Sequence, residues 1–287
     1  MNTIMQKITR YVPDKVYLQL MYFKHFKKFI NFSNPKTYNE KLQWLKLNDR
    51  QDIYTTMVDK YLVKQYVTDI IGGQYIIPTL GVWNTAEDID FDSLPDKFVL
   101  KWNHDSGSVI ICKNKQMLDR AATIEKLNKS KSHNGYWYAR EWPYKNVNPC
   151  IIAEQYMEDS KTSELRDYKF FCFNGVAKAL FVASERQKKG EEVKFDFFDM
   201  DFKHLKLRQG HPNAKICPEK PETFEEMKYL AEKLSKNIPQ LRVDFYEVDG
   251  RVYFGELTFS HFAGMVPFEP KEWDETMGSW IALPNQK

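Results

Sequence analysis

Residues 241–259 read LRVDFYEVDGRVYFGELTF, with two strand-like arms on either side of Asp249-Gly250. Side chains alternate between the two faces of a strand, and Asp-Gly between such arms is typical of a β-hairpin turn. A two-residue loop would pair residues of opposite parity and separate Asp244 from Glu256. A loop of odd length, with Gly250 left-handed, or a bulge would bring the two carboxylates onto one face.

In that second register Arg242 and Thr258 share the face with Asp244 and Glu256. Two carboxylates beside a guanidinium can hold Mg²⁺ and a polyphosphate. The hairpin alone is also compatible with an exposed, solvated sheet face. The choice between these interpretations depends on the rest of the chain.

The composition is that of an ordinary globular protein. The 287 residues are 43% hydrophobic and 28% charged, which argues against disorder. A net charge of +3 from 42 basic and 39 acidic residues gives no electrostatic case for binding nucleic acid.

The sequence predicts a cytoplasmic protein. Residues 1–10 lack the apolar segment of a signal peptide, and no apolar run approaches the roughly 20 residues that span a bilayer. The basic and aromatic segment 22–29 (YFKHFKKF) would suit contact with the inner face of a membrane, but a helix end with inward aromatics is favoured. Reduced thiols are expected, rather than disulfides or a metal site, at Cys112, Cys150, Cys172 and Cys217.

The patterning predicts an α+β protein with antiparallel sheets. We expect a helical N-terminal region (1–73), a small subdomain (74–150) and a larger subdomain with the hairpin (151–287). Tight turns such as Asn174-Gly175 join neighbouring strands, which disfavours a doubly wound parallel sheet. Expected helices cover 15–29, 38–46, 52–71, 116–128 and 224–235, the second and last with capping boxes at Thr37/Glu40 and Thr223/Glu226. Other expected strands cover 75–79, 98–102, 109–112, 151–157, 168–173, 177–183 and 193–198.

A small polar loop follows the apolar strand that Lys101 closes. The loop carries Ser106, Gly107 and Ser108, and the backbone amides of such a loop can approach phosphate oxygens closely. Lys101 would add a positive charge. The loop lacks the Gly-Lys-Ser/Thr of a Walker A sequence, and a plain hairpin turn is the alternative.

Two further segments carry candidate nucleotide contacts. The strand beginning at Ile151 ends in Glu154, Tyr156 and Met157, which could form a hinge against an adenine ring; a sheet-edge strand is the alternative. Lys169 is a candidate second phosphate contact, and a cross-strand ion pair is its alternative.

Lysine strand, glycine loop, hinge glutamate, second lysine and carboxylate hairpin follow one another in the order typical of the ATP-grasp superfamily. Asp59-Lys60 with Lys64 also resembles the Asp-Lys helix start of those enzymes. The fuller resemblance is to the ATP-grasp proteins of bacterial surface-polysaccharide synthesis, the teichuronopeptide-biosynthesis (TupA-like) type. The segments that carry it are 34–44 (NPKTYNEKLQW), 101–107 (KWNHDSG), 140–144 (REWPY), 165–171 (LRDYKFF), 255–259 (GELTF), 268–273 (FEPKEW) and 278–280 (GSW).

This resemblance implies an ATP-grasp fold, with an ATP cleft enclosed by two antiparallel-sheet subdomains. It implies that Lys101 and Lys169 contact the phosphates, Glu154 the adenine or ribose, and Asp244 and Glu256 a Mg²⁺ ion.

Three more residues receive roles in this scheme. Thr258 stands where many ATP-grasp enzymes have asparagine, and is a weaker neutral ligand for a second Mg²⁺. Ser260 and His261 follow in a candidate acceptor loop, where they would contact substrate; ordinary loop polarity is the alternative.

The resemblance implies an ATP-dependent carboxylate–amine ligase that acts through an acyl phosphate, with Lys169 at the phosphoryl group and Arg242 stabilising charge. The implied substrates are a uronic-acid carboxyl on a surface glycan or precursor and an amino-acid amine. A glycosyltransferase using Asp199-Met200-Asp201 is the main alternative, although a strand-ending turn is the favoured interpretation of that segment. A glycan kinase using the same ATP site, and a binding module without turnover, also remain open.

Overall fold

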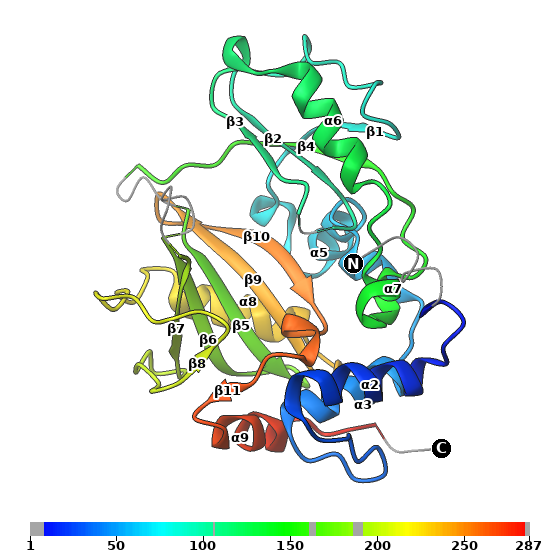
Figure 1. Cartoon of the computed structure of the whole chain (residues 1–287). Coiled ribbons are helices and arrows are strands. Elements are labelled where there is room, and N and C mark those ends of the chain that lie inside the picture. The colour runs from blue at the N-terminus through cyan, green and yellow to red at the C-terminus, as the bar shows by residue number, and fades with distance from the viewer. Residues whose placement is uncertain (1–8, 106, 161–164, 186–191, 285–287) are drawn as a thin grey trace. The chain divides into compact units, whose positions relative to one another are not determined.

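The computed structural model describes residues 9–105, 107–160, 165–185 and 192–284 (Figure 1). The chain forms two compact units. The smaller is Gln51–Met157, and the larger combines Met1–Arg50 with Glu158–Lys287. The sequence-based division at 73/74 and 150/151 follows motifs rather than contacts, and it stays a prediction.

The smaller unit is built on a four-stranded antiparallel sheet in the order β1-β4-β2-β3. Helix α6 is tied to this sheet, because the Trp102 indole N–H donates to the Leu127 carbonyl at 2.8 Å. The strands are β1 (Thr79–Trp83), β2 (Phe98–Trp102), β3 (Ile110–Cys112) and β4 (Ile151–Gln155). The helices are α4 (Ile53–Val58), α5 (Val63–Ile71), α6 (Arg120–Ser130) and α7 (Gly135–Ala139), with 3-10 turns η1 (Gly73–Tyr75), η2 (Lys115–Met117) and η3 (Trp142–Tyr144).

Two expectations for the smaller unit are wrong. The helix expected over 52–71 is broken, because the Asp59 carboxylate accepts from the Tyr61 and Leu62 amides while the Lys60 amide donates to Asn103. The strand expected over 75–79 begins only at Thr79, because Gly73–Tyr75 forms a 3-10 turn.

The larger unit is built on a five-stranded antiparallel sheet in the order β10-β9-β5-β6-β7. Helix α8 (Phe224–Leu234) packs on one face of it (Figure 1). The Phe224 and Phe170 rings lie 5.9 Å apart in this contact. The strands are β5 (Asp167–Phe173), β6 (Val176–Ser184), β7 (Lys194–Phe198), β9 (Leu241–Val248) and β10 (Arg251–Thr258). A separate two-stranded ladder joins β8 (Arg208–Gln209) to β11 (Phe268–Glu269).

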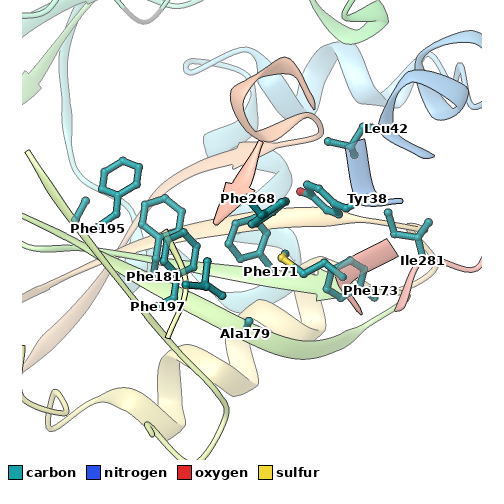
Figure 2. Close-up of a cluster of buried hydrophobic side chains, with 13 residues drawn as sticks. Tyr38, Leu42, Phe171, Phe173, Ala179, Phe181, Phe195, Phe197, Phe268 and Ile281 are labelled. Atoms are coloured by element: carbon teal, nitrogen blue, oxygen red, sulfur yellow. The ribbon is translucent and has the colours of Figure 1, made fainter. Parts of the chain in front are cut away.

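The opposite face of this sheet carries the aromatic core of the larger unit. Figure 2 shows Phe171, Phe181 and Phe197 from the neighbouring strands β5, β6 and β7, with Tyr38 of helix α3 close to Phe171. The layer over this face comprises α3 (Tyr38–Asn48), α9 (Glu272–Trp280) and the 3-10 turn η4 (His261–Gly264), and α2 (Asp14–Phe26) packs on α3. Residues of β5 with odd numbers point to this layer, so Lys169 shares a face with Phe171.

Local signals in the larger unit have mixed outcomes. The capping box at Thr37 and Glu40 is confirmed, and Asn174-Gly175 closes a two-residue hairpin with both residues at positive φ. The capping box expected at Thr223 is wrong, because the Thr223 hydroxyl donates instead to Glu247 at 2.5 Å.

The β9–β10 hairpin reaches the carboxylate-matching register by a bulge. Its loop is the two-residue Asp249-Gly250, with φ of 51° and 73°. The register then shifts between Phe254 and Glu256, so that Glu256 pairs with Asp244. A Cβ on Gly255 would lie 3.0 Å from the Asp244 carbonyl oxygen, so glycine suits the close approach at the bulge.

Candidate functional site

The larger unit gathers a cluster of charged side chains on three adjacent strands. The backbone register pairs Lys169 of β5 with Asp244 of β9, and Asp244 with Glu256 of β10. Arg242, two residues before Asp244, pairs with Thr258. We call Lys169, Arg242, Asp244 and Glu256 the hairpin cluster. The sequence predicted that the hairpin members share a face, and the structure confirms it.

Asp244 is the centre of the hairpin cluster and is fully buried. Its Oδ1 accepts from Arg242 Nε at 2.8 Å, and its Oδ2 accepts from Arg242 Nη2 at 2.7 Å. Lys169 Nζ bonds to the same Oδ2 and also lies 2.7 Å from Asp167 Oδ2. The arrangement is a two-pronged arginine–carboxylate pair with a lysine bridging two aspartates.

Glu256 forms the accessible edge of the hairpin cluster. Its Oε1 accepts from Arg242 Nη2 at 2.8 Å, and its side chain is 37% exposed, against 1% for Asp244. The Thr258 hydroxyl lies 3.5 Å from the same Oε1. Glu256 is therefore the carboxylate best placed to meet a solvated ligand.

Burial and charge act against each other in the hairpin cluster. Burial raises the pKa of Asp244 to about 6, although Arg242 and Lys169 both favour the ionised carboxylate. Burial alone would lower the pKa of Arg242, but Asp244 and Glu256 raise it further above its usual range. Arg242 is accordingly a permanent cation.

His261 lies behind Arg242, inside the aromatic core. Its Nδ1 is 2.7 Å from Arg242 Nη1, and its ring lies 5.2 Å from the rings of Phe171 and Phe181. Burial, with the charges of Arg242 and Lys169, holds the pKa of His261 well below its usual value, so the imidazole is neutral. Because Arg242 can only donate, Nδ1 accepts and the proton is assigned to Nε2.

Ser260 and His261 are both buried, with exposed fractions of 7% and 2%. The Ser260 carbonyl accepts from the Ala263 amide and closes the turn η4, while His261 contacts Arg242. Their assignment as substrate contacts stays a prediction, which would require this loop to open.

The smaller unit holds a second charged group, centred on Glu154. Lys101 Nζ lies 2.5 Å from Glu154 Oε2, and Lys64 Nζ lies 2.8 Å from Oε1. Lys64 also donates to the Ile77 carbonyl and the Thr79 hydroxyl. Burial would raise the pKa of Glu154, but the two lysines lower it below its usual value. Glu154 is thus the shared counter-charge of two lysines, and its adenine or ribose role stays a prediction.

The loop after β2 is held closed by its own side chains. Ser108 Oγ donates to Asp105 Oδ1 at 2.5 Å and accepts from the Trp102 amide at 2.9 Å. Gly107 is exposed, and a Cβ built on it would meet nothing within 4 Å. Ser108 therefore shapes the loop, Gly107 lies open to a ligand, and Ser106 lies outside the described residues.

The expected hinge follows β4, which ends at Gln155. Tyr156 and Met157 are half-buried beyond it, and the ammonium groups of Lys97 and Lys113 lie 5.7 and 5.5 Å from the Tyr156 ring. Their assignment as an adenine-binding surface stays a prediction.

The Asp199-Met200-Asp201 segment forms a turn at the end of β7. Asp199 Oδ1 accepts from the amides of Asp201 at 3.0 Å and Lys203 at 2.8 Å. This carboxylate caps its own turn, as the favoured structural interpretation expected.

The hairpin cluster fits a Mg²⁺ ion in part. Within the described residues, no group of three or more His, Cys, Asp or Glu side chains is arranged to hold a metal. Mg²⁺ usually takes only one or two protein carboxylates together with substrate phosphates, so the partly exposed Glu256 suits it. Asp244 suits it less, because both oxygens already bind Arg242 and Lys169.

Sequence reasoning missed two contacts of these groups, Lys64 with Glu154 and Arg242 with His261. Lys64 was noted only for its resemblance to a helix start, and its contact with Glu154 depends on tertiary packing. The shared strand face of Asp167 and Lys169 follows from their spacing in the sequence, and the structure forms an ion pair between them. The hydrogen bond from Arg242 to His261 joins β9 to the loop that follows β10, and no local sequence pattern predicts it.

Two antiparallel units, one with a lysine pair and glycine loop and one with a carboxylate hairpin, define a protein of the ATP-grasp class. The family described as TupA-like ATP-grasp matches residues 40–282, and the chain belongs to that family. The resemblance stated from the sequence is therefore confirmed. The comparison with curated proteins gives no match.

Solved structures with a similar fold include ATP-grasp ligases. D-alanine–D-alanine ligase from Bacillus anthracis complexed with ATP is 15% identical over 71% of this chain and 54% of its own, with a TM-score of 0.42. The Helicobacter pylori ligase of that name is 13% identical over 85% and 69%, with a TM-score of 0.46. ATP-grasp ligase PsnB with its minimal precursor is 12% identical over 79% and 62%, with a TM-score of 0.44. The chain spans between 54% and 69% of the length of these three proteins.

Proposed function

We propose that this chain is an ATP-dependent carboxylate–amine ligase that acts through an acyl phosphate. The proposed substrates are a uronic-acid carboxyl of a bacterial surface glycan or its precursor and the amine of an amino acid. The observation that carries the proposal is the hairpin cluster, in which a carboxylate pair, an arginine and a lysine meet on adjacent strands of a chain from the ATP-grasp family.

The proposed binding roles follow the positive and negative groups of each unit. Lys101 in the smaller unit and Lys169 in the larger would each bind phosphate oxygens of ATP. Both are paired with carboxylates now, at 2.5 Å for Lys101 and Glu154. A polyphosphate would compete with those carboxylates for the two side chains, whose positions the ion pairs fix before ATP binds.

A metal role falls first on Glu256 in this proposal. Glu256 would hold Mg²⁺, with Asp244 as a second ligand once Lys169 turns to a phosphate. Bound Mg²⁺ neutralises charge on the transferring phosphoryl group. Arg242 would remain against Asp244 and stabilise the negative charge that develops on the acyl carbon's oxygen.

The proposed reaction has two balanced steps. A carboxylate oxygen of the glycan attacks the γ-phosphorus, the bond to the β-phosphate bridging oxygen breaks, and ADP leaves. The amine then attacks the acyl carbon, the carbon–oxygen bond to phosphate breaks, and the nitrogen loses a proton. The products are an amide, ADP and inorganic phosphate that carries one oxygen from the substrate carboxylate.

The decisive experiment follows that oxygen. The full chain is incubated with ATP, Mg²⁺, an oligosaccharide whose uronic-acid carboxyl carries oxygen-18, and a panel of amino acids. We expect ADP release that needs both carboxylate and amine, with oxygen-18 in the released phosphate. Lys101→Met should abolish it and Glu256→Gln should raise the Mg²⁺ concentration that it needs, whereas Tyr229→Ser, on the exposed surface of α8, should change neither.

Other outcomes would assign a different reaction. ADP release with phosphate retained on the glycan and no need for an amine would establish a kinase. UDP release from UDP-sugars, lost in Asp199→Ala, would establish a glycosyltransferase. Absence of ATP binding by the wild-type chain in calorimetry would overturn the proposal itself.

A further inference from the structure

Helix α2 presents an apolar stripe to solvent. Val16, Leu20 and Phe23 are spaced four and three residues apart, so they lie along one side of the helix. Their exposed fractions are 49%, 59% and 43%. The other side of α2 faces α3 (Figure 1). Leu18 and Tyr22 on that side are fully buried in a small core.

The stripe continues beyond the C-terminal end of the helix. Phe29 is 62% exposed and stacks on Phe23, with ring centroids 4.8 Å apart and planes at 22°. Of the aromatic segment 22–29, only Tyr22 is buried, and Phe26 is half-buried. The expectation that this segment packs its aromatics inward therefore holds for one side of the helix only.

Exposed lysines border the apolar stripe. They are Lys15, Lys24, Lys27 and Lys28. Asp14 is the sole acidic residue between residues 9 and 36, and its Oδ2 accepts from Arg50 Nη2 at 2.7 Å. Among the four lysines, Lys28 lies 3.6 Å from Glu40 Oε1 and its side chain stays 51% exposed. The stripe and its lysines, which we call the α2 face, are thus apolar in the middle and positive at the margin.

We propose that the α2 face binds the surface of an anionic lipid bilayer. Leu20, Phe23 and Phe29 would enter the boundary between head groups and acyl chains, and the lysines would meet anionic head groups. Lysine stems extend along apolar surface while the ammonium stays in water, which suits this margin. A second copy of the chain is a poorer occupant, because pairing two such faces would bring like charges together.

This inference concerns α2 within the larger unit and is independent of the proposed ligase activity. None of the helices in the described part of the chain is long and apolar enough to cross a bilayer.

The test measures co-sedimentation of the full chain with vesicles. We expect binding to vesicles of phosphatidylcholine with phosphatidylglycerol, little binding to phosphatidylcholine alone, and weakening as sodium chloride is raised. Lys24→Glu with Lys27→Glu should weaken binding by at least about 25-fold, from about fivefold for each lysine near an anionic surface. Leu20→Ser with Phe23→Ser should weaken it by about tenfold or more.

Matched controls come from the exposed side of α8 and its end. Lys233→Glu with Lys236→Glu makes the same charge change, and Tyr229→Ser removes an exposed aromatic. These variants should bind vesicles as the wild type does, and all variants should keep the wild-type circular dichroism and the vesicle-free rate of ATP turnover.

Three results would overturn the inference. The first is that the wild type does not bind anionic vesicles. The second is that the α8 control substitutions weaken vesicle binding as much as the α2 substitutions do. The third is that light scattering shows a dimer that Phe23→Ser dissociates, while the protein does not bind vesicles.

Discussion

Arg242 donates from Nη1 to Nδ1 of His261 across 2.7 Å, and both residues are buried in the larger unit. The remaining nitrogens of Arg242 bind Asp244 and Glu256, so His261 fixes the side of the guanidinium that faces the aromatic core. A second cation at this position would repel Arg242. The neutral state of His261 is therefore a condition for the hairpin cluster to assemble.

Two substitutions of His261 distinguish the role of its hydrogen-bond acceptor Nδ1 from the role of its side-chain volume. His261→Leu leaves a buried arginine N–H without an acceptor, which costs about 1–3 kcal/mol. His261→Asn keeps an acceptor oxygen near the position of Nδ1, so it should recover part of that loss. Urea unfolding measures both effects, and the turnover of ATP should follow the same order.

Phe262→Leu serves as the control, because Phe262 packs against the His261 ring, whereas the Arg242 guanidinium donates to His261 itself. If His261→Leu and His261→Asn lose equal stability, the acceptor has no role and only packing matters.

The pH dependence of stability has a predicted sign. The pKa of His261 is lowered in the folded state from 6.5. The contribution of the neutral imidazole to the free energy of unfolding is therefore complete above pH 6.5 and is lost as the pH falls below that value. Between pH 7.5 and 5.5 the stability difference between wild type and His261→Asn should move by about 1.4 kcal/mol in favour of the variant.

Asp244 has the opposite effect on stability between pH about 4 and 6. Its pKa is raised in the folded state, so its ionisation makes the protein less stable as the pH rises through this range. Asp244 is present in both proteins, so the difference isolates the imidazole. Parallel stability curves for wild type and variant would show that His261 can take up a proton while folded.

The sequence predicted much of the fold because its signals are local. Alternating strands, the Asn174-Gly175 turn and the capping box at Thr37 are each written in a few neighbouring residues. The helix break near Asp59 was missed because it depends on Asn103, which is far along the chain.

The site was predictable only as a set of residue types. Alternation of side chains along the two strands, together with one extra residue in the hairpin, places Asp244 and Glu256 on one face. Gly255 is that extra residue. The sequence could not predict that Asp244 is buried and that its carboxylate binds both Lys169 and Arg242. Such ion pairs are formed by packing, which has no local signature.

Gly255→Ala tests the bulge directly. The added Cβ would lie 3.0 Å from a backbone oxygen of Asp244, which cannot move without disturbing the ladder. We expect a loss of about 1–3 kcal/mol and a fall in ATP turnover, because Glu256 and Asp244 would no longer be paired. Gly73→Ala is the matched control, since its Cβ would meet only a methyl group at 3.6 Å. A Gly255→Ala protein as stable and active as the control would show that the register does not need glycine.

Glu154→Gln tests the lysine pair of the smaller unit. Without the negative charge of Glu154, the ammonium groups of Lys64 and Lys101 lose their common anion. We expect the free energy of unfolding to fall by about 3–5 kcal/mol. Lys64→Met in the same protein should restore part of the stability by removing one cation. If Glu154 instead contacts the adenine base of ATP, Glu154→Gln would leave urea unfolding unchanged and would alter the preference for ATP over GTP.

Asp244→Asn and Glu256→Gln separate structure from metal binding, because the two carboxylates differ in exposure. Asp244→Asn removes the buried anion that holds Lys169 and Arg242, so it should cost about 3–5 kcal/mol in urea unfolding. Glu256→Gln removes a 37% exposed carboxylate and should cost less than about 1 kcal/mol, while raising the Mg²⁺ concentration needed for half-maximal ADP release. Glu269→Gln, at an exposed ion pair with Arg208, is the control and should change neither quantity. An unchanged Mg²⁺ requirement in active Glu256→Gln would remove this residue from the proposed metal site.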